Sequence, residues 1–543
     1  MIEVARKIIN VDKFKRIAIA TFICGLVAHA YVFLNAMYIQ DSAGLFNNMS
    51  LRAIFNPERM TPLTGLWSYL LGDTKLPWIN GLIVLGIYAF SSYLTCEILE
   101  IQSDLIRIAI ACILVINPAF ISSNLYTVSI EFSVALLFSV LGTFFVLKDQ
   151  KRYKLLGFVF MFLCLGTYGP YISWSLSLMV LIKIRYILSD YKLGEIFKQE
   201  IKSVLGYLGV LVALLIFCAL LKGQNQDRVD HAFSILYDGT IFISFLEQIK
   251  NTVLSYVPDN IVNMIGATRG FNSDYSGFFI ENRLLVVLYY IAIVLTIIAF
   301  FCILRRSITK LLVLLLHLIV LIMVRDLFGI VTQSHTLMQF AYITPWILIL
   351  MTGDILQNYD DNLFHKVYKA AVVVLSVFTV ISGILLANTA YMKEENTYIA
   401  SLMLSNRIAD KVESVDGYVP GTTEVWFIGD IQKYYANEQS GFARARDIMG
   451  VRSPFFDCGI IIPINMENYL VEHAKLNMKF ALEPNFMDYD NPEVYYDIFR
   501  RNGHDVQVDE FVDAYNAAAT FPNNNCAFWC DGVLIFKLGS YDY

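Results

Sequence analysis

Residues 38–73 read YIQDSAGLFNNMSLRAIFNPERMTPLTGLWSYLLGD and separate the first two long apolar runs of the chain. The stretch carries a carboxylate, Asp41, directly after the first run and an arginine, Arg59, before the second. Apolar residues recur at helical spacing over residues 45–55, and residues 63–71 form a second short apolar pattern with a tryptophan and a tyrosine. Such patterns are typical of helices that lie in the membrane interface, although two ordinary loop helices packing on a bundle fit as well. We therefore predict a charged loop at one membrane face.

The composition indicates a membrane protein. Of the 543 residues, 57% are hydrophobic and only 16% are charged, whereas a soluble domain of this size has about a quarter charged residues. The deficit falls in long apolar runs, so the expected class is an α-helical polytopic membrane protein. The net charge of -6 and the lack of a basic cluster indicate that nucleic acid is not a partner.

Eleven apolar runs are long enough to cross about 30 Å of hydrocarbon, some of them with tilt. The first run follows a basic leader and lacks a small-residue cleavage site, so we expect it to be an anchor rather than a cleaved signal. The predicted spans are residues 17–36, 77–97, 105–123, 129–147, 154–169, 171–187, 203–221, 284–304, 309–325, 338–354 and 367–391.

The positive-inside rule predicts a cytoplasmic N-terminus, because the alternate loops that would then face inward hold most of the cations. These cations are Lys148, Lys151, Arg152, Lys154, Lys183, Arg185, Lys192, Lys198, Lys202, Arg305, Arg306, Lys310, Lys366 and Lys369. An odd number of spans places the C-terminus outside. Residues 1–391 then form a transmembrane domain with outer loops 37–76 and 222–283. Residues 392–543 alternate strand-like and helix-like runs, which predicts an extracytoplasmic α/β domain.

The C-terminal part carries three cysteines, Cys458, Cys526 and Cys530. In an oxidising compartment they allow one disulfide and one free thiol. No histidine stands near them at ligand spacing, so we predict no metal site there. Residues 488–490 match the D-x-D pattern of some metal-dependent sugar transferases, but the match is short and is followed by Asn-Pro, which favours a turn.

Two carboxylates are candidates for a general base. Asp41 follows the first span in the outer loop, where it could remove a proton from an acceptor hydroxyl. A solvated charge at a span end is the simpler alternative, and Glu58 and Asp73 are rivals in the same loop. Glu131 begins the fourth span after a hydroxyl-rich loop. It would suit a cavity that binds sugar hydroxyls, but the helix dipole also favours an acid at this position.

Three residues are candidates for binding phosphate. Arginine binds phosphate as a planar fork and stays charged when it is partly desolvated. Arg59 meets this description in the first outer loop but could be an ordinary loop cation. Arg325 ends the ninth span, where an ionisable residue near hydrocarbon is costly, and its neighbour Asp326 offers a local ion pair as the alternative. His335 lies in a predicted outer loop, where it could bind phosphate. The alternative is that it is an ordinary solvated polar residue.

Polar and aromatic residues at the same outer level could bind sugar. Asn124 and Tyr126 belong to the hydroxyl-rich loop before the fourth span, and Tyr168 ends the fifth span. Aromatic rings stack on sugars, but they also gather at membrane interfaces without any ligand. We predict that these three residues bind sugar, and the alternative is that they belong to the ordinary polar and aromatic belt of the membrane interface.

Three stretches carry a family resemblance. They are residues 38–72, INPAFISSNLYTVSIEFSVAL (residues 116–136) and LGTYGPYISWSLSL (residues 165–178). Together with the layout of residues 10–430, they resemble the GT-C class of membrane glycosyltransferases. Within that class they are most similar to the bacterial and phage glucosyltransferases that modify O-antigen and related surface glycans.

The resemblance implies a reaction and its partners. Such enzymes transfer a sugar, typically glucose, from a polyprenyl-phosphate donor to a glycan acceptor on the outer face of the bacterial cytoplasmic membrane. No cofactor or metal motif is implied. A flippase and a donor-synthesising glycosyltransferase are further expected partners. By position, Asp41 matches the acidic motif of the first loop and Arg59 matches the arginine before its second helix. Glu131 and Tyr168 match an acidic residue and a tyrosine at the corresponding later positions.

Two departures from the family pattern leave the base open between Asp41 and Glu131. Ser42 stands where relatives often have a second acid, and Gly169 stands where a polar residue is frequent. A transporter or flippase of a lipid-linked saccharide is the alternative function, although internal repeats and broken helices are not evident in the sequence. A non-catalytic membrane scaffold is the second alternative.

Overall fold

The computed structural model describes residues 10–37, 61–63, 66–67, 76–125, 128, 130–189, 191–220, 283–325, 327, 336–357, 359, 363–429, 456–457, 460–461, 470–471, 475–482 and 491–538. The chain divides into two compact units. The first comprises residues 1–36 and 48–390, and the second comprises residues 37–47 and 391–543. One long helix, α18 (Leu363–Glu413), contributes to both. The predicted assignment of residues 1–391 to a transmembrane domain and of residues 392–543 to an extracytoplasmic domain stays a prediction.

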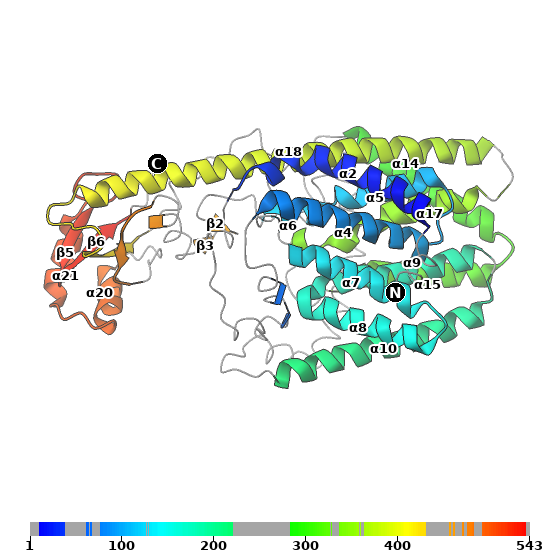
Figure 1. Ribbon diagram of the computed structural model, residues 1–543, viewed down its shortest axis with the longest axis horizontal. Coiled ribbons are helices and arrows are strands. Elements are labelled where there is room, and N and C mark those ends of the chain that lie inside the picture. The colour runs from blue at the N-terminus through cyan, green and yellow to red at the C-terminus, as the bar shows by residue number, and fades with distance from the viewer. Residues whose placement is uncertain are drawn as a thin grey trace. The chain divides into compact units, whose positions relative to one another are not determined.

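Apolar helices build the first unit (Figure 1). They are α2 (Val11–Leu34), α4 (Pro77–Ile98), α5 (Asp104–Val115), α6 (Pro118–Leu125), α7 (Ile130–Val146), α8 (Lys151–Tyr168), α9 (Ile172–Leu188), α10 (Leu193–Leu220), α14 (Arg283–Leu304), α15 (Ile308–Arg325), α17 (Thr344–Leu356) and α18, with short 3-10 turns η2 (Gly169–Tyr171), η4 (Thr336–Met338) and η5 (Phe340–Ile343). Among the described residues, eight helical stretches are long and apolar enough to cross a membrane. The polytopic class is therefore confirmed, whereas the number of eleven spans stays a prediction.

Prolines account for several helix boundaries. Pro77 begins α4, Pro118 begins α6, and Pro170 lies in the turn between α8 and α9. Proline has no backbone N–H and is tolerated in the first turn of a helix, where that donor has no intrahelical partner. The predicted division of the fifth and sixth spans around Pro170 corresponds to the division between α8 and α9.

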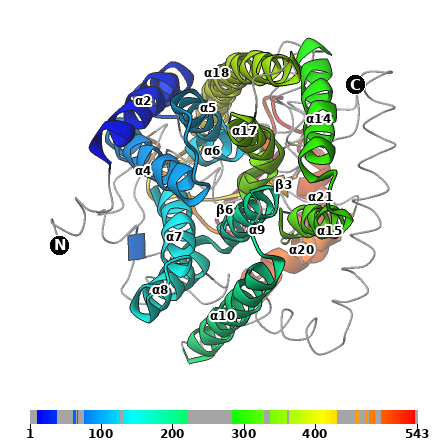
Figure 2. The same ribbon diagram turned by 90° about the vertical axis from the view of Figure 1, so that its right-hand side faces the viewer.

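α9 is the central helix of the first unit (Figure 2). It contacts α4, α7, α8, α10, α14, α15 and α17. Its serine-rich start suits this position, because the hydroxyl of Ser175 lies 2.6 Å from that of Thr143 on α7 and 2.7 Å from that of Tyr207 on α10. In hydrocarbon a polar group must find its partner within the protein, so these small hydroxyls hold α9 to its neighbours.

A buried carboxylate joins α17, α9 and the α4–α5 connection at the end of the bundle where α9 and α17 finish. Asp354 on α17 is fully buried and accepts hydrogen bonds from the backbone N–H groups of Gln102 (2.9 Å) and Ser103 (2.8 Å). Its other oxygen lies 3.0 Å from Nη1 of Arg185 on α9. Because the positive-inside rule places Arg185 on the cytoplasmic side, we interpret this end as the inner one.

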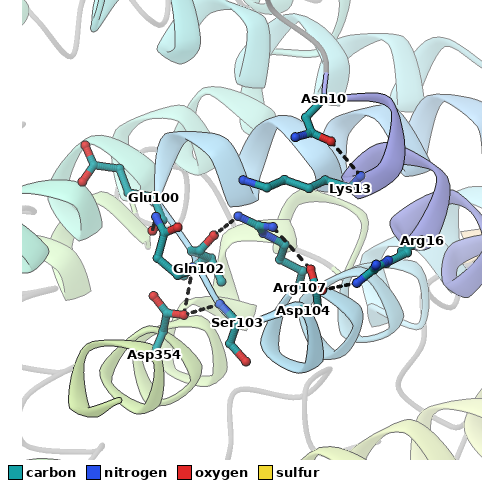
Figure 3. Close-up of polar contacts among 10 residues, drawn as sticks. Asn10, Lys13, Arg16, Glu100, Gln102, Ser103, Asp104, Arg107 and Asp354 are labelled. Atoms are coloured by element: carbon teal, nitrogen blue, oxygen red, sulfur yellow. Dashed lines mark hydrogen bonds and ion pairs between the residues drawn. The ribbon is translucent and has the colours of Figure 1, made fainter. Parts of the chain in front are cut away.

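A second arginine extends the same group of contacts along the α4–α5 connection. Arg107 on α5 is buried, and its guanidinium donates to the carbonyl of Ile101 and lies 3.4 Å from Asp104. Asp104 also pairs with Arg16 on α2 (Figure 3). Asp104 and Arg16 are about half exposed, so their pair contributes less to stability than the buried pair of Asp354 and Arg185.

The second unit contains a four-stranded sheet with the strand order β4-β1-β6-β5. The strands are β1 (Glu424–Ile428), β4 (Lys479–Phe480), β5 (Ala527–Cys530) and β6 (Val533–Lys537), and a separate pair is formed by β2 (Phe456–Asp457) and β3 (Ile460–Ile461). β1 runs parallel to β4 and β6, with Glu424 opposite Val533, and β5 runs antiparallel to β6. Helices α20 (Pro492–Arg501) and α21 (Val508–Ala517) complete the described elements.

Both faces of this sheet are covered. The C-terminal part of α18 packs Leu404 and Ile408 against a cluster that includes Phe427 and Phe536. α20 and α21 pack against a second cluster around Trp426. Alternate residues of β1 enter the two clusters, as the period of two in a strand requires.

The two described cysteines of the second unit lie in different clusters. Cys526 belongs to the cluster beneath α18, and Cys530 belongs to the cluster beneath α20 and α21. Both are buried free thiols, so neither forms the disulfide that the sequence allowed. Cys458 lies outside the described residues.

We predict that replacing Asp354 with alanine lowers the free energy of unfolding in detergent by about 3–5 kcal/mol, because the Arg185 guanidinium stays buried without its carboxylate. The control is Arg16→Ala, which removes only the half-exposed pair with Asp104 and should cost less than about 1 kcal/mol. Thermal unfolding followed by intrinsic fluorescence measures both variants. Equal losses for the two variants would contradict the role assigned to Asp354.

We also predict that Cys530 resists alkylation in the folded protein. Burial, together with the negative charges of Glu510 and Asp531, raises the pKa of the Cys530 thiol to about 11. The reactive thiolate is therefore scarce at pH 8. Iodoacetamide at pH 8, followed by peptide mass spectrometry, should modify Cys530 only after denaturation. Complete modification of the native protein would show that the thiol is accessible.

Candidate functional site

Polar and aromatic residues gather at the end of the bundle opposite to Asp354. Here α6, η2, η4 and η5 meet. Phe340 of η5 is the central contact, because its carbonyl accepts a hydrogen bond from the amide of Asn117 (3.1 Å) and its ring lies 5.4 Å from Tyr171 and 5.3 Å from Trp174. A carbonyl from one loop and an amide from another thus fix two connections that are more than 200 residues apart in sequence.

His29 is a buried polar residue of this region that sequence reasoning missed. It lies on α2, and its Nε2 atom is 2.7 Å from the carbonyl oxygen of Val115 while its Nδ1 atom is 3.3 Å from the amide nitrogen of Asn124. A carbonyl only accepts, so Nε2 carries the proton and Nδ1 accepts from the amide. Single histidines in apolar runs are common, and the sequence alone gave no sign of this pairing.

This contact changes the interpretation of Asn124. Its side chain is 1% exposed and is hydrogen-bonded to His29. The amide therefore holds α6 to α2 through one of its N–H groups. The predicted sugar-binding role of Asn124 stays a prediction.

Glu131 and Tyr168 are brought to the same end of the bundle by two neighbouring helices. Glu131 lies in the first turn of α7 and is partly buried, and Tyr168 ends α8. The ring of Phe132, next to Glu131, meets the ring of Tyr168 edge to face at 4.8 Å. Tyr168 also lies 5.5 Å from Tyr171. Tyr168 on α8 thus contacts the residue that follows Glu131 on α7.

Close packing of glycines sets the separation of α7 and α8. A Cβ atom added to Gly157 on α8 would lie 2.7 Å from the backbone nitrogen of Val146 and 2.8 Å from the carbonyl oxygen of Gly142, both on α7. Small residues let helix backbones approach closely in a membrane. The position of Tyr168 relative to Glu131 therefore depends on this contact.

Arg325 is the last residue of α15 and is 6% exposed. Its guanidinium lies 4.5 Å from the centre of the Tyr342 ring, just after η5 begins. A cation at a helix C-terminus is favoured by the helix dipole, and an aromatic face stabilises it further. The structure therefore places a buried positive charge at the end of the bundle that also holds η5.

Four other predicted site residues, Asp41, Arg59, Tyr126 and His335, lie outside the described residues. The alternative pairing of Arg325 with Asp326 is likewise outside them. Among the described residues, no group of three or more histidine, cysteine, aspartate or glutamate side chains is arranged to hold a metal ion.

Residues 62–352 match the model of the family described as Glucosyl transferase GtrII. The chain belongs to this family. The resemblance to glucosyltransferases that modify surface glycans is thereby confirmed at the family level. No curated protein and no solved structure matches the chain.

The match to the GtrII family covers most of the first unit, from the residues before α4 to α17. It includes the predicted residues Asn124, Glu131, Tyr168 and Arg325. Asp41 and Arg59 precede the match, and residues 391–543 follow it. The family assignment thus supports glucosyl transfer by the helical bundle and leaves the individual site residues as predictions.

The glycine contact makes a direct prediction. Gly157→Ala should lower the apparent melting temperature in detergent, because the new methyl group meets backbone atoms that cannot move aside independently. The matched control is Gly209→Ala on α10, where a Cβ atom would meet nothing within 4 Å. This control should be neutral or slightly stabilising, since alanine favours a helix over glycine by about 1 kcal/mol. A melting temperature for Gly157→Ala equal to that of the control would contradict the assigned packing.

Proposed function

We propose that this member of the GtrII family transfers glucose from a polyprenyl-phosphate donor to a surface glycan at the outer face of the bacterial cytoplasmic membrane. The family match supports the glucosyl transfer. The buried guanidinium of Arg325 is the observation that supports a lipid-phosphate donor. A positive charge held at a helix end next to an aromatic ring suits an anionic leaving group that approaches from the membrane.

The proposed reaction is a single displacement at the anomeric carbon. An acceptor hydroxyl attacks this carbon, a carboxylate takes the hydroxyl proton, and the bond from the anomeric carbon to the phosphate oxygen breaks. Polyprenyl phosphate leaves with the bonding electron pair, and Arg325 and Arg59 stabilise the negative charge that develops on it. One displacement inverts the configuration of the sugar.

Two carboxylates are proposed for proton removal. Asp41 is the first because it lies in the outer loop that resembles the acidic motif of the family. Glu131 is the second because it is partly buried in the first turn of α7, and its neighbour Phe132 contacts Tyr168, whose ring is a proposed sugar ligand. His335 remains a proposed phosphate ligand, and Tyr168, Asn124 and Tyr126 remain proposed sugar ligands.

The proposed topology follows from the charge distribution. The N-terminus lies in the cytoplasm and the second unit lies outside, so the donor must be made on the inner face and moved across the membrane. A donor-synthesising glycosyltransferase and a flippase are therefore the proposed partners, together with the glycan acceptor and the bilayer.

The first test is transfer of radiolabelled glucose from polyprenyl-phosphate glucose to the surface polysaccharide of the host, in proteoliposomes. Arg325→Ala should reduce the rate by about 100-fold, as removal of one transition-state donor does in other enzymes. Arg325→Lys keeps the charge but not the planar fork, so its rate should lie between those of the wild type and Arg325→Ala. The matched control is Arg306→Ala, an exposed arginine before the start of α15.

Asp41→Asn and Glu131→Gln in the same assay distinguish the two candidate bases. Wild-type protein that transfers no glucose, but moves the lipid-linked sugar across the liposome membrane, would establish the transporter alternative instead. A rate for Arg325→Ala equal to that of Arg306→Ala would exclude Arg325 from the donor site.

A further inference from the structure

α18 carries a buried face at the end of its apolar part. Leu386, Ala390 and Tyr391 lie on this face and are fully buried. Glu394 lies on the same face, one turn after Ala390, and is 1% exposed. A carboxylate therefore occupies a position that the helical period assigns to the protein interior.

Glu394 lacks the contacts that other buried charges of the protein have. Both of its carboxylate oxygens are inaccessible and have no hydrogen-bond partner among the described residues. Asp354, by contrast, binds two backbone N–H groups and Arg185. Lys183 binds Gln199 at 2.5 Å, and His317 lies 2.6 Å from Glu200.

An unsatisfied buried carboxyl group is costly. Burying a polar group without a hydrogen bond costs free energy, and burying an unpaired charge costs more. A leucine at this position would continue the apolar face of α18 and remove the cost. The cost is understandable where the missing hydrogen-bond donor is supplied by a ligand, since functional sites are where such groups are kept.

The position on α18 indicates the chemistry of this ligand. Residues Leu363–Asn396 are apolar enough to span a membrane, so Glu394 lies within two residues of the end of that span. By the predicted orientation this is the outer end, where the head group of a membrane lipid meets water. A sugar ring carried by such a lipid, or presented to it, has several hydroxyl donors at this level and no charge of its own.

We propose that Glu394 binds hydroxyl groups of a hexose ring, and is a sugar-binding residue distinct from the candidate bases Asp41 and Glu131. The hexose is either the glucosyl group of the lipid donor or a sugar of the acceptor glycan. A carboxyl group accepts hydrogen bonds from two hydroxyls at once, which fixes the orientation of the ring. This proposal rests on the proposed glucosyl transfer, because that reaction supplies the hexose.

Chemical labelling tests the proposal without requiring activity. Dicyclohexylcarbodiimide enters apolar sites and adds the O–H group of a carboxylic acid across one of its C=N bonds, and the adduct rearranges to a stable N-acylurea. Full-length protein in nanodiscs should carry this label on Glu394, as detected by peptide mass spectrometry. A sugar ligand at ten times its dissociation constant should reduce the labelling about tenfold.

Three probes separate the sources of the hexose. Protection by polyprenyl-phosphate glucose alone assigns Glu394 to the donor, and protection by the released surface polysaccharide of the host alone assigns it to the acceptor. Polyprenyl phosphate without a sugar should not protect. Equal protection by that lipid, or no protection by any sugar, would overturn the proposal.

Variants provide the second measurement. Glu394→Gln should fold, because it removes a buried charge at constant shape, and should lower glucosyl transfer at least tenfold. The control is Asp410→Asn, an exposed acid on the same helix, which should transfer like the wild type. Wild-type transfer by Glu394→Gln or Glu394→Leu would overturn the role of Glu394 and leave the proposed function intact. An inactive wild type in this assay would overturn the proposed function, while the labelling result still decides whether Glu394 binds sugar.

Discussion

The bundle depends on one constraint, which is that polar groups inside a membrane must be satisfied by other groups of the protein. Asp354 shows how this constraint determines structure. Its carboxylate accepts from two consecutive backbone N–H groups of the α4–α5 connection and from Arg185 of the central helix α9. These three contacts fix where α4 ends, where α5 begins and how α17 meets α9. A charge in the interior is stable here because each of its oxygens has a partner.

The opposite end of the bundle follows the same rule with neutral groups. His29 joins the carbonyl of Val115 to the amide of Asn124, and Asn117 joins α6 to η5. These bonds anchor the connections from which a substrate would be bound, so the loops of this end are held by the core beneath them. Arg325 is a charged residue of this end, and its guanidinium lies against the ring of Tyr342. In the proposed reaction, a rigid support of this kind would hold the guanidinium in position before a phosphate arrives.

Local sequence predicted the helices well, because their signals are local. Apolar length and the prolines at residues 77, 118 and 170 mark where helices run and begin. The contacts between helices were not predictable in this way. Asp354 bonds to partners about 170 and 250 residues away, and nothing in the run LMTGDIL identifies them. Asn124 was predicted to bind sugar from its polar neighbours, and only the packing of α2 against α6 revealed that its amide already binds His29.

Glu394 could be predicted only in part from the sequence. The sequence KEEN offers two adjacent acids on a helix that leaves the membrane, and at such a place solvated charges are ordinary. The helical period distinguishes them, because it turns Glu394 toward the buried face of α18 while Glu395 is only partly buried. A position so close to water would let the carboxyl group escape its cost through a small rotation of the helix. The tether of Asn388 to the carbonyls of Val27 and Ala28 opposes that rotation. The packing of Asn388 against α2 therefore opposes a rotation of α18 that would bring Glu394 to water. In the proposal, a carboxyl group held in this way would orient the sugar ring that it binds.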